Sequence, residues 1–434
     1  MITHYIVGSN HRVLRCSILF LTALLVGCSS DGKRPNVLLV LIDTLRADHL
    51  HCYGYDGKIT DHLDSLASEG VRWSCCQAQS SWTLPSMTSI FTGVTERAHL
   101  AGTRGEHLYG IGRELSTLPD LFSEMDYATF GIFNAPVMDV EYGFTRGCQS
   151  YDVEGCRETV DAEVVVDRIF EWVDGDIEQP FFIVAHFFDP HWPYTAPDGP
   201  QDLANVSASS IRRRNANGRI TVREMHDMMS CYDMEIRYCD RELGRLFAGL
   251  RQRGLDENTI IVVVADHGEE FLDHGMMFHG RQFFQETIHV PLIMSGPGIP
   301  EDSVVDDVVG QYDILPTLMH LTEGSVPDYV QGVSLLPTDG VGHEGVPSSG
   351  VNTGLKQRAA VRFGDAKVLW DADADSAWGY DLSQGFEDED SRLAPDRTQV
   401  ENVRTYWATV PVAIPDPVEV GDHKAKWFKD MAYI

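Results

Sequence analysis

Three residues that could bind a metal ion stand where apolar runs of strand length end. Asp43 follows one such run, and the pair Asp266 and His267 follows another. Two carboxylates and an imidazole suit Zn²⁺ or Mn²⁺, whereas Ca²⁺ is less natural once histidine is a ligand. The alternative is structural, with Asp43 capping a helix and Asp266-His267-Gly268 forming a turn. We predict one divalent metal ion, with zinc or manganese favoured and calcium as the alternative.

A threonine that could act as a nucleophile, Thr83, precedes a predicted short helix. Pro85 suits the first turn of this helix and Gly93 suits its end. Thr83 then lies at or beside the helix N-cap, where backbone N–H groups and the helix dipole favour an anion. A threonine hydroxyl is a weak nucleophile, and coordination to a divalent ion would activate it. An ordinary capping threonine is the alternative interpretation.

The elements that must position these residues alternate along the chain. Continuous apolar runs are typical of strands buried on both faces, and helical patterns lie between them. The predicted fold is therefore α/β, with a large doubly wound, mostly parallel sheet flanked by helices. Ligands of such sheets bind beyond the carboxyl ends of the strands. The runs span residues 36–42, 181–186, 260–265 and 290–295, and the helical patterns span 60–69, 159–173 and 221–253.

The character of the chain changes from about Val351 onward. Short alternating runs at 359–363 and 366–370, followed by the acidic loop 387–390, predict a small β-rich region. We therefore divide the chain into four parts. They are a signal peptide (1–27), a tether (28–34), an α/β catalytic domain (35–345), and a C-terminal β-rich subdomain with a terminal helix (346–434).

The first 28 residues have the pattern of an export signal. Basic residues between positions 11 and 15 precede an apolar run at 16–26, which is too short to span a bilayer. The ending Leu25-Val26-Gly27-Cys28 resembles a bacterial lipobox, in which the cysteine is lipidated. We predict a cell-envelope lipoprotein, periplasmic or on the outer surface, attached to the membrane through lipid on Cys28. An ordinary signal peptide with a chance cysteine is the alternative.

The charge of the chain bears on its partners. The 434 residues carry a formal net charge of −31, from 34 basic and 65 acidic side chains. This balance argues against nucleic acid as a partner, because a phosphate backbone requires a basic face. An anionic substrate would need a site that reverses this field locally with cations and a metal ion.

The candidate residues also carry a family resemblance. The run from Asp43-Thr44-Leu45-Arg46 to Leu50 and the run Phe188-Asp189-Pro190-His191-Trp192-Pro193-Tyr194 closely resemble motifs of the sulfatases, a branch of the alkaline-phosphatase-like hydrolases. The resemblance covers roughly residues 34–400 and implies the fold of that family. Further similar segments follow in order at 63–71, 81–93, 265–270, 279–281, 290–293, 313–318, 332–336 and 380–382.

The resemblance implies a role for each matching residue. Asp43, Asp266 and His267 fall on the metal ligands of the family. Thr83 falls on its nucleophile, which is also a metal ligand. Arg46 is expected to orient the metal-binding loop.

Other matching residues fall on groups that contact the substrate. His191 falls on a histidine that contacts the transferred group or protonates the leaving oxygen, and His279 is expected to assist. Arg281 stands near the position of a lysine that grips the anionic oxygens. Asp189, His191 and His279 form the set that two-metal relatives use, but the spacing around His191 is more similar to single-metal relatives, so one metal is favoured.

Three departures from the family pattern affect the expected chemistry. Sulfatases carry Cys-x-Pro-Ser-Arg, whose cysteine becomes formylglycine, and this chain has Thr83 for the cysteine and Met87 for the arginine. Oxidised threonine would be a poorly hydrated ketone, so we expect the threonine hydroxyl itself to react. Thr44 stands where sulfatases usually carry a second aspartate, which again favours zinc or manganese.

These features predict a metal-dependent hydrolase of anionic sulfate or phosphate/phosphonate esters that forms a covalent intermediate on Thr83. A phosphothreonine can be cleaved by a metal-activated water, whereas a sulfothreonine lacks the easy collapse of a formylglycine hemiacetal. Phosphate or phosphonate esters are therefore favoured. Two alternatives stay open: a transferase of phospho-head-groups, and a catalytically silent, surface-anchored binding protein with this fold.

Overall fold

The computed structural model describes residues 33–424, apart from 105–106, 176, 204–205, 339–342, 351–357, 384, 389–390, 410, 420 and 422–423. The predicted signal peptide, Cys28 and most of the tether lie outside the described residues. Arg34–Ile434 forms one compact unit. A search of the described helices finds none with the length and apolar character that crossing a membrane requires.

An eight-stranded sheet forms the centre of this unit, in the order β12-β2-β11-β8-β1-β7-β5-β6. Strand β11 runs antiparallel to both of its neighbours, and the other strand pairs of the sheet are parallel. This confirms the predicted mostly parallel sheet. The strands are β1 (Asn36–Ile42), β2 (Gly70–Gln77), β5 (Ala128–Ile132), β6 (Ser150–Asp152), β7 (Phe181–Phe187), β8 (Thr259–Ala265), β11 (His289–Ser295) and β12 (Ser303–Gly310).

The three central strands β1, β7 and β8 are buried along their whole length. Their near-continuous apolar sequences suit this position, because helices cover both faces of the sheet. Ile42 at the end of β1 lies beside Phe187 of β7 and Ala265 of β8. The chain therefore leaves all three strands at the same level, which brings the residues that follow them to one edge of the sheet.

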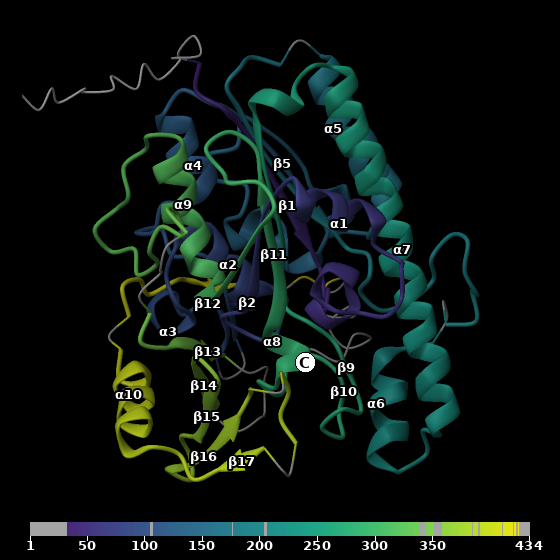
Figure 1. The fold of residues 1–434 in the computed structure, drawn as a ribbon, viewed down its shortest axis with the longest axis vertical. Coiled ribbons are helices and arrows are strands. Elements are labelled where there is room, and N and C mark those ends of the chain that lie inside the picture. The colour runs from purple at the N-terminus through teal and green to yellow at the C-terminus, as the bar shows by residue number, and fades with distance from the viewer. Residues whose placement is uncertain are drawn as a thin grey trace, which may run out of the picture. The chain divides into compact units, whose positions relative to one another are not determined.

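Helices flank the sheet on both sides, with α1, α5 and α7 gathered on one side and α2, α4 and α9 on the other (Figure 1). Helix α7 begins at a capping box in which Thr221 and Glu224 bind each other's backbone N–H groups. The α-helices that precede the C-terminal sheet are α1 (Asp61–Ser68), α2 (Thr83–Thr92), α3 (Glu96–His99), α4 (Leu118–Glu124), α5 (Ala162–Asp174), α6 (Ala208–Ala216), α7 (Val222–Gln252), α8 (Gln285–Ile288) and α9 (Ile314–Leu321).

A second, five-stranded antiparallel sheet lies toward the C-terminus, in the order β13-β14-β15-β16-β17. Helix α10 (Arg397–Trp407) packs on β14 and β15, where Val403 joins a small apolar core with Val361 and Trp370. This sheet confirms the predicted β-rich region, and the division of the chain at residue 345 stays a prediction. The strands are β13 (Val346–Ser349), β14 (Arg358–Phe363), β15 (Ala366–Asp371), β16 (Ser376–Asp381) and β17 (Arg392–Leu393).

The predicted terminal helix stays a prediction, because residues 425–434 lie outside the described residues. After α10 the chain returns to the larger part of the molecule, where β18 (Pro417–Val418) pairs with β4 (His107–Tyr109). Strand β4 pairs in turn with β3 (Gly102–Arg104). A further hairpin, β9 (Glu270–Phe271) and β10 (Met277–Phe278), follows β8 and leads into the loop that carries His279.

Candidate metal centre and reactive site

Asp43, Asp266 and His267 meet at the carboxyl edge of the central strands. Each offers one ligand atom, these atoms lie within 4.8 Å of one another, and all three residues are buried. His267 Nε2 is 3.2 Å from Asp266 Oδ2 and 3.7 Å from Asp43 Oδ1. The ends of β1 and β8, which are far apart in the chain, thus supply one group of candidate ligands.

The carboxylates of this group lack the hydrogen bonds that buried oxygens normally have. Both side-chain oxygens of Asp43 and Oδ2 of Asp266 have no hydrogen-bond partner among the described residues. Most buried polar atoms are paired, so unpaired carboxylate oxygens at one point need an explanation. A divalent cation supplies it, because two carboxylates and one imidazole are ligands that zinc and manganese accept.

The electrostatics of the three groups agree with a cation site. Burial, followed by the charges of Asp266 and Glu269, raises the pKa of Asp43 well above its ordinary value. Burial also disfavours the charged form of Asp266, but the neighbouring His267 holds the pKa of Asp266 below its ordinary value. A bound dication would favour the ionised form of both carboxylates.

Thr83 lies next to these ligands. It is the first residue of α2, one position further into the helix than an N-cap, and its Oγ1 is 3.3 Å from His267 Nε2. The turn before the helix is fixed by Ser86, whose hydroxyl donates to the Ser80 carbonyl (2.8 Å) and accepts from the Ser80 N–H (3.2 Å). The helix ends at Gly93 in the left-handed conformation, with φ of 68°. Thr83 is therefore held with its hydroxyl toward the metal ligands.

The loop after β1 is held in a conformation that its residues would not adopt alone. Thr44 has φ of 55°, which is strained for a β-branched residue. Its N–H donates to Asp266 Oδ1 (3.1 Å), and its carbonyl accepts from the Tyr232 hydroxyl (2.7 Å). Arg46, which was expected to orient this loop, donates to the Glu269 carbonyl (3.1 Å). These contacts join the loops that follow β1 and β8.

Two further histidines, His191 and His279, pack around the ligand group. The His279 ring centroid lies 4.3 Å from that of His267 and 5.1 Å from that of His191. His279 Nδ1 is 2.8 Å from Glu269 Oε1, and the Tyr194 hydroxyl donates to Glu269 Oε2 (2.9 Å). The Nδ1 side of His279 is therefore engaged with the Glu269 carboxylate.

Burial keeps these two imidazoles neutral. It lowers the pKa of His191 to about 3, with the neighbouring His279 adding to the effect. Burial and the nearby His267 likewise hold the pKa of His279 well below its ordinary value. Burial raises the pKa of Glu269. A neutral imidazole is the form that can accept a proton during a reaction.

Arg281 and Asp189, unlike His279, are not seen in contact with the metal ligands in the part of the chain that the structure describes. The Arg281 guanidinium is partly buried, and among the described residues none of the metal ligands forms a hydrogen bond or ion pair with it. Asp189 lies beside Glu235 of α7, and burial raises the pKa of Asp189 to about 7 and that of Glu235 to about 10. Asp189 thus interacts with Glu235 of α7, and its Oδ2 has no hydrogen-bond partner among the described residues.

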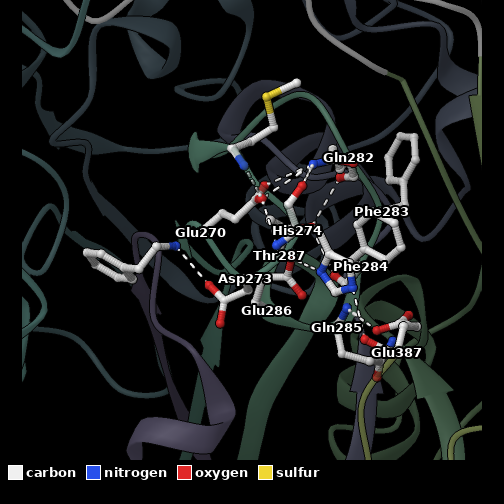
Figure 2. A network of polar contacts seen from close by, with 12 residues as sticks. Glu270, Asp273, His274, Gln282, Phe283, Phe284, Gln285, Glu286, Thr287 and Glu387 are labelled. Carbon is white, nitrogen blue, oxygen red and sulfur yellow. Dashed lines mark hydrogen bonds and ion pairs between the residues drawn. The ribbon is translucent and has the colours of Figure 1, made fainter. Parts of the chain in front are cut away.

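The loop that carries His279 and Arg281 is anchored by a polar network (Figure 2). His274 Nδ1 is 2.7 Å from Glu286 Oε1, and its Nε2 is 2.9 Å from the Glu387 carbonyl. Glu270 Oε1 accepts from the Met276 N–H (2.8 Å). The contact with Glu387 brings a segment of the C-terminal region to this loop.

Sequence reasoning assigned no role to three residues that the structure places at the site, Glu269, Tyr194 and His186. His186 Nε2 is 3.5 Å from Asp43 Oδ2, and the residue is fully buried. Its signal was a histidine near the end of an otherwise apolar strand, residues 181–187. Glu269 and Tyr194 lie inside recognised motifs, but their partners are brought to them by the fold.

Comparisons with known proteins agree with this architecture. The family model described as Sulfatase matches residues 35–325. A curated relative, the uncharacterized sulfatase YidJ of Escherichia coli, is 25% identical over 363 residues, which cover 70% of this chain and 71% of the relative.

Solved structures with the same fold include a sulfatase and a phosphonate hydrolase. A structure from Bacteroides thetaiotaomicron, described as a putative sulfatase, has a TM-score of 0.70 and 21% identity, covering 87% of this chain and 91% of its own. The phosphonate monoester hydrolase of Agrobacterium radiobacter has a TM-score of 0.67 and 20% identity, covering 86% and 94%.

Proposed function

Because the chain belongs to the sulfatase family and is an ester hydrolase of that group, we propose that Thr83 is its nucleophile and that its preferred substrates are phosphate or phosphonate esters. The observation that carries this proposal is the position of Thr83 Oγ1, 3.3 Å from His267 Nε2 and beside two carboxylates with unpaired oxygens. A hydroxyl at such a point can share a cation with the ligands and be activated as a nucleophile.

The metal ion would be held by Asp43, Asp266, His267 and Thr83. When bound, such an ion lowers the pKa of a coordinated hydroxyl and stabilises negative charge on the transferred group. The described residues offer one group of carboxylate and imidazole ligands that can meet at a single point, and zinc or manganese fits it best.

In the first step the Thr83 oxygen attacks phosphorus, a new O–P bond forms, and the bond to the ester oxygen breaks. The Thr83 proton passes to neutral His279, whose Nδ1 side is held by Glu269 at 2.8 Å. Glu269 stabilises the imidazolium that results, as a carboxylate does for the histidine of other hydrolases. The leaving oxygen departs with its electron pair and takes that proton, and His191 contacts the group in transfer.

In the second step water attacks the phosphothreonine and the bond between Thr83 and phosphorus breaks. His279 accepts the water proton and returns it to the Thr83 oxygen, so that the free enzyme is restored. The N-terminus of α2, where Thr83 is the first residue, directs backbone N–H groups at the developing negative charge. The partly buried Arg281 is the cation that we expect to reach the substrate oxygens.

The preference for phosphorus rests on the nucleophile. A threonine ester of sulfate has no hemiacetal that can collapse, whereas a phosphothreonine is open to attack at phosphorus. A solved structure with the same fold is named as a phosphonate monoester hydrolase, which supports phosphorus esters as substrates of this architecture. A sulfate ester substrate is the alternative.

The test compares hydrolysis of an aryl phosphodiester and an aryl sulfate by the wild-type chain, Thr83→Ala and Thr88→Ala. Thr88 is a matched control on the same helix, because it is also buried and its hydroxyl donates to the Leu84 carbonyl (2.8 Å). We expect Thr83→Ala to lose at least about 10³-fold in kcat, with an unchanged melting temperature, and Thr88→Ala to keep most of the activity.

Near-full turnover by Thr83→Ala would refute the assignment of the nucleophile. Faster, Thr83-dependent hydrolysis of the sulfate would show that the substrate preference is wrong while the nucleophile is right. Metal content, expected at about one zinc or manganese per chain, is measured on the same samples.

Export and lipid attachment are a separate proposal, which rests on the sequence Leu25-Val26-Gly27-Cys28. Lipidation of Cys28 would attach the enzyme to the cell envelope. In a bacterial host we expect the wild-type chain to fractionate with membranes and Cys28→Ser to be released or left unprocessed. Equal fractionation of both chains would contradict the proposal.

A further inference from the structure

His186 is a buried imidazole that the proposed reaction does not use. It is the sixth of the seven residues of β7, where it pairs with Leu41 of β1, and it is fully buried. Among the described residues, neither of its ring nitrogens has a partner at hydrogen-bond geometry. Oδ2 of Asp43 is 3.5 Å from His186 Nε2.

An apolar residue would suit this position better if the fold alone mattered. The other residues of β7 are apolar, and burial costs free energy for an imidazole whose nitrogens have no hydrogen-bond partner of normal geometry. Such a group is expected to have a function that outweighs this penalty. Its Nε2 lies near the carboxylate of a predicted metal ligand, Asp43.

The two oxygens of Asp43 face two different imidazoles. Oδ1 is 3.7 Å from His267 Nε2, and Oδ2 is 3.5 Å from His186 Nε2. The group of ligand atoms that lie within 4.8 Å of one another contains Asp43, Asp266 and His267. His186 stands outside that group, on the far side of the Asp43 carboxylate, so it is placed to act on Asp43 and not to share the same ion.

Two acceptors compete for the single proton of a neutral His186 ring. One is the Asp43 carboxylate, whose Oδ2 is 3.5 Å from Nε2, and the other is the backbone of Asn134. An ionised carboxylate is a stronger acceptor than a backbone carbonyl. Nε2 is the ring nitrogen that faces Asp43, so the tautomer with its proton on Nε2 places a donor toward this carboxylate.

We infer that His186 is a positioning residue for the metal centre: in the tautomer that carries its proton on Nε2, it donates to Oδ2 of Asp43 and leaves Oδ1 to bind the metal. The inference rests on the proposed metal site. Hydrogen bonds to the outer oxygen of a ligating carboxylate fix its orientation, and loss of such partners typically weakens metal binding about 10–100-fold.

The test is a Mn²⁺ titration of the full chain after removal of metal with a chelator, in the wild type, His186→Leu, His186→Gln and His99→Leu. Leu removes the donor, whereas the Gln amide places an N–H near the position of Nε2. His99 is the matched control, because it is also fully buried but is bound to Ser89 Oγ and to the Ala101 N–H, both at 3.0 Å.

We expect the Kd for Mn²⁺ to rise about 10–100-fold in His186→Leu and less than about threefold in His186→Gln. The melting temperature of metal-free His186→Leu should equal or exceed that of the wild type, because two unpaired nitrogens are removed. His99→Leu should show the reverse, with a lower melting temperature and an unchanged Kd.

An unchanged Kd in His186→Leu would overturn the inference. A second outcome would also overturn it: the Leu and Gln variants lose the same affinity for Mn²⁺, and both metal-free proteins melt at a lower temperature. That result would show that His186 has a structural role. If the wild-type chain itself binds no Mn²⁺ or Zn²⁺, the metal centre of the proposed function fails, and this inference fails with it.

Discussion

Two buried clusters of ionisable residues in this molecule differ in how well their charges are matched. One is the metal group, Asp43, Asp266 and His267, whose carboxylate oxygens are partly unpaired. The other, which we call the Lys367 cluster, contains Lys367, Glu387, His274, Glu286 and Glu270. The fully buried Lys367 ammonium donates to the Glu387 carboxylate and to the Phe283 carbonyl.

The Lys367 cluster supplies its own partners. His274 stacks on Phe284 with ring centroids 3.6 Å apart and binds Glu286 and the Glu387 backbone (Figure 2). Glu387 also accepts from the Gln285 N–H (3.0 Å). Buried charges that are paired and hydrogen-bonded within the chain need no ligand to hold them.

The contrast between the clusters indicates which buried charges point to a ligand. Burial alone does not, because both clusters are buried and both contain histidine and carboxylates. Unpaired carboxylate oxygens that converge beside an imidazole do, since the protein leaves out of the metal group the donors that it supplies in the Lys367 cluster. Removing the ammonium group from the Lys367 cluster should therefore destabilise the metal-free protein, whereas removing the Asp43 carboxylate from the metal group should stabilise it.

The greatest loss of stability is expected from Lys367→Met. It leaves the Glu387 carboxylate buried beside a methionine, which should lower the free energy of unfolding by about 3–5 kcal/mol. Urea unfolding measures this loss. The double variant Lys367→Met with Glu387→Gln should recover most of it, because no unpaired charge remains, and failure of the double variant to recover would show that packing, and not charge, holds the cluster together.

Addition of metal should stabilise the protein through the metal group, and this effect should not depend on the Lys367 cluster. Mn²⁺ or Zn²⁺ at about 100 times its Kd should raise the free energy of unfolding by about 2.7 kcal/mol, and a chelator should reverse the change. Calorimetry with and without metal checks this. Metal should raise the free energy of unfolding of the Lys367→Met variant by the same amount. A smaller rise in that variant would show that the two clusters are energetically coupled.

Asp43→Asn should act in the opposite sense to Lys367→Met. The folded-state pKa of Asp43 is raised by burial, so its contribution to stability is present at low pH and is lost as the pH rises through the folded pKa. An asparagine is neutral at all pH, so the metal-free variant at pH 7 should be more stable than the wild type. It should also lose the stabilisation by metal. A destabilised metal-free variant would contradict the comparison.

A smaller effect, seen as a dependence on pH, is expected from Glu270→Gln. Burial and the charge of Glu286 raise the pKa of Glu270 to about 8. The pKa of a glutamate in the unfolded chain is about 4.3, which is lower than the folded value. The stability that this group contributes is therefore fully present below about pH 4.3 and is lost as the pH rises toward 8. Glu270→Gln should match the wild type at pH 4 and melt a few degrees higher at pH 8. Equal melting temperatures at both pH values would refute this assignment.

Much of the architecture was predictable because local patterns carry it. The apolar run 36–42 is β1 as predicted, and the helical pattern at 221–253 matches α7 with its cap at Thr221. Pro85 and Gly93 marked α2, and Thr83 lies directly beside the N-cap residue, within its predicted place. These features depend on periodicity and on residues with restricted backbone conformations, which neighbouring positions in the sequence reveal.

Residue order was enough to establish the mostly parallel α/β sheet, the metal ligands as candidates, and the substitution of Thr83 for cysteine. Which of these residues meet depends on the three-dimensional fold. In the fold, His279 contacts Glu269, Asp189 contacts Glu235, and His186 lies beside the Asp43 carboxylate. The reason is that these contacts join residues far apart in the chain, through the register of parallel strands, and no local pattern encodes that register.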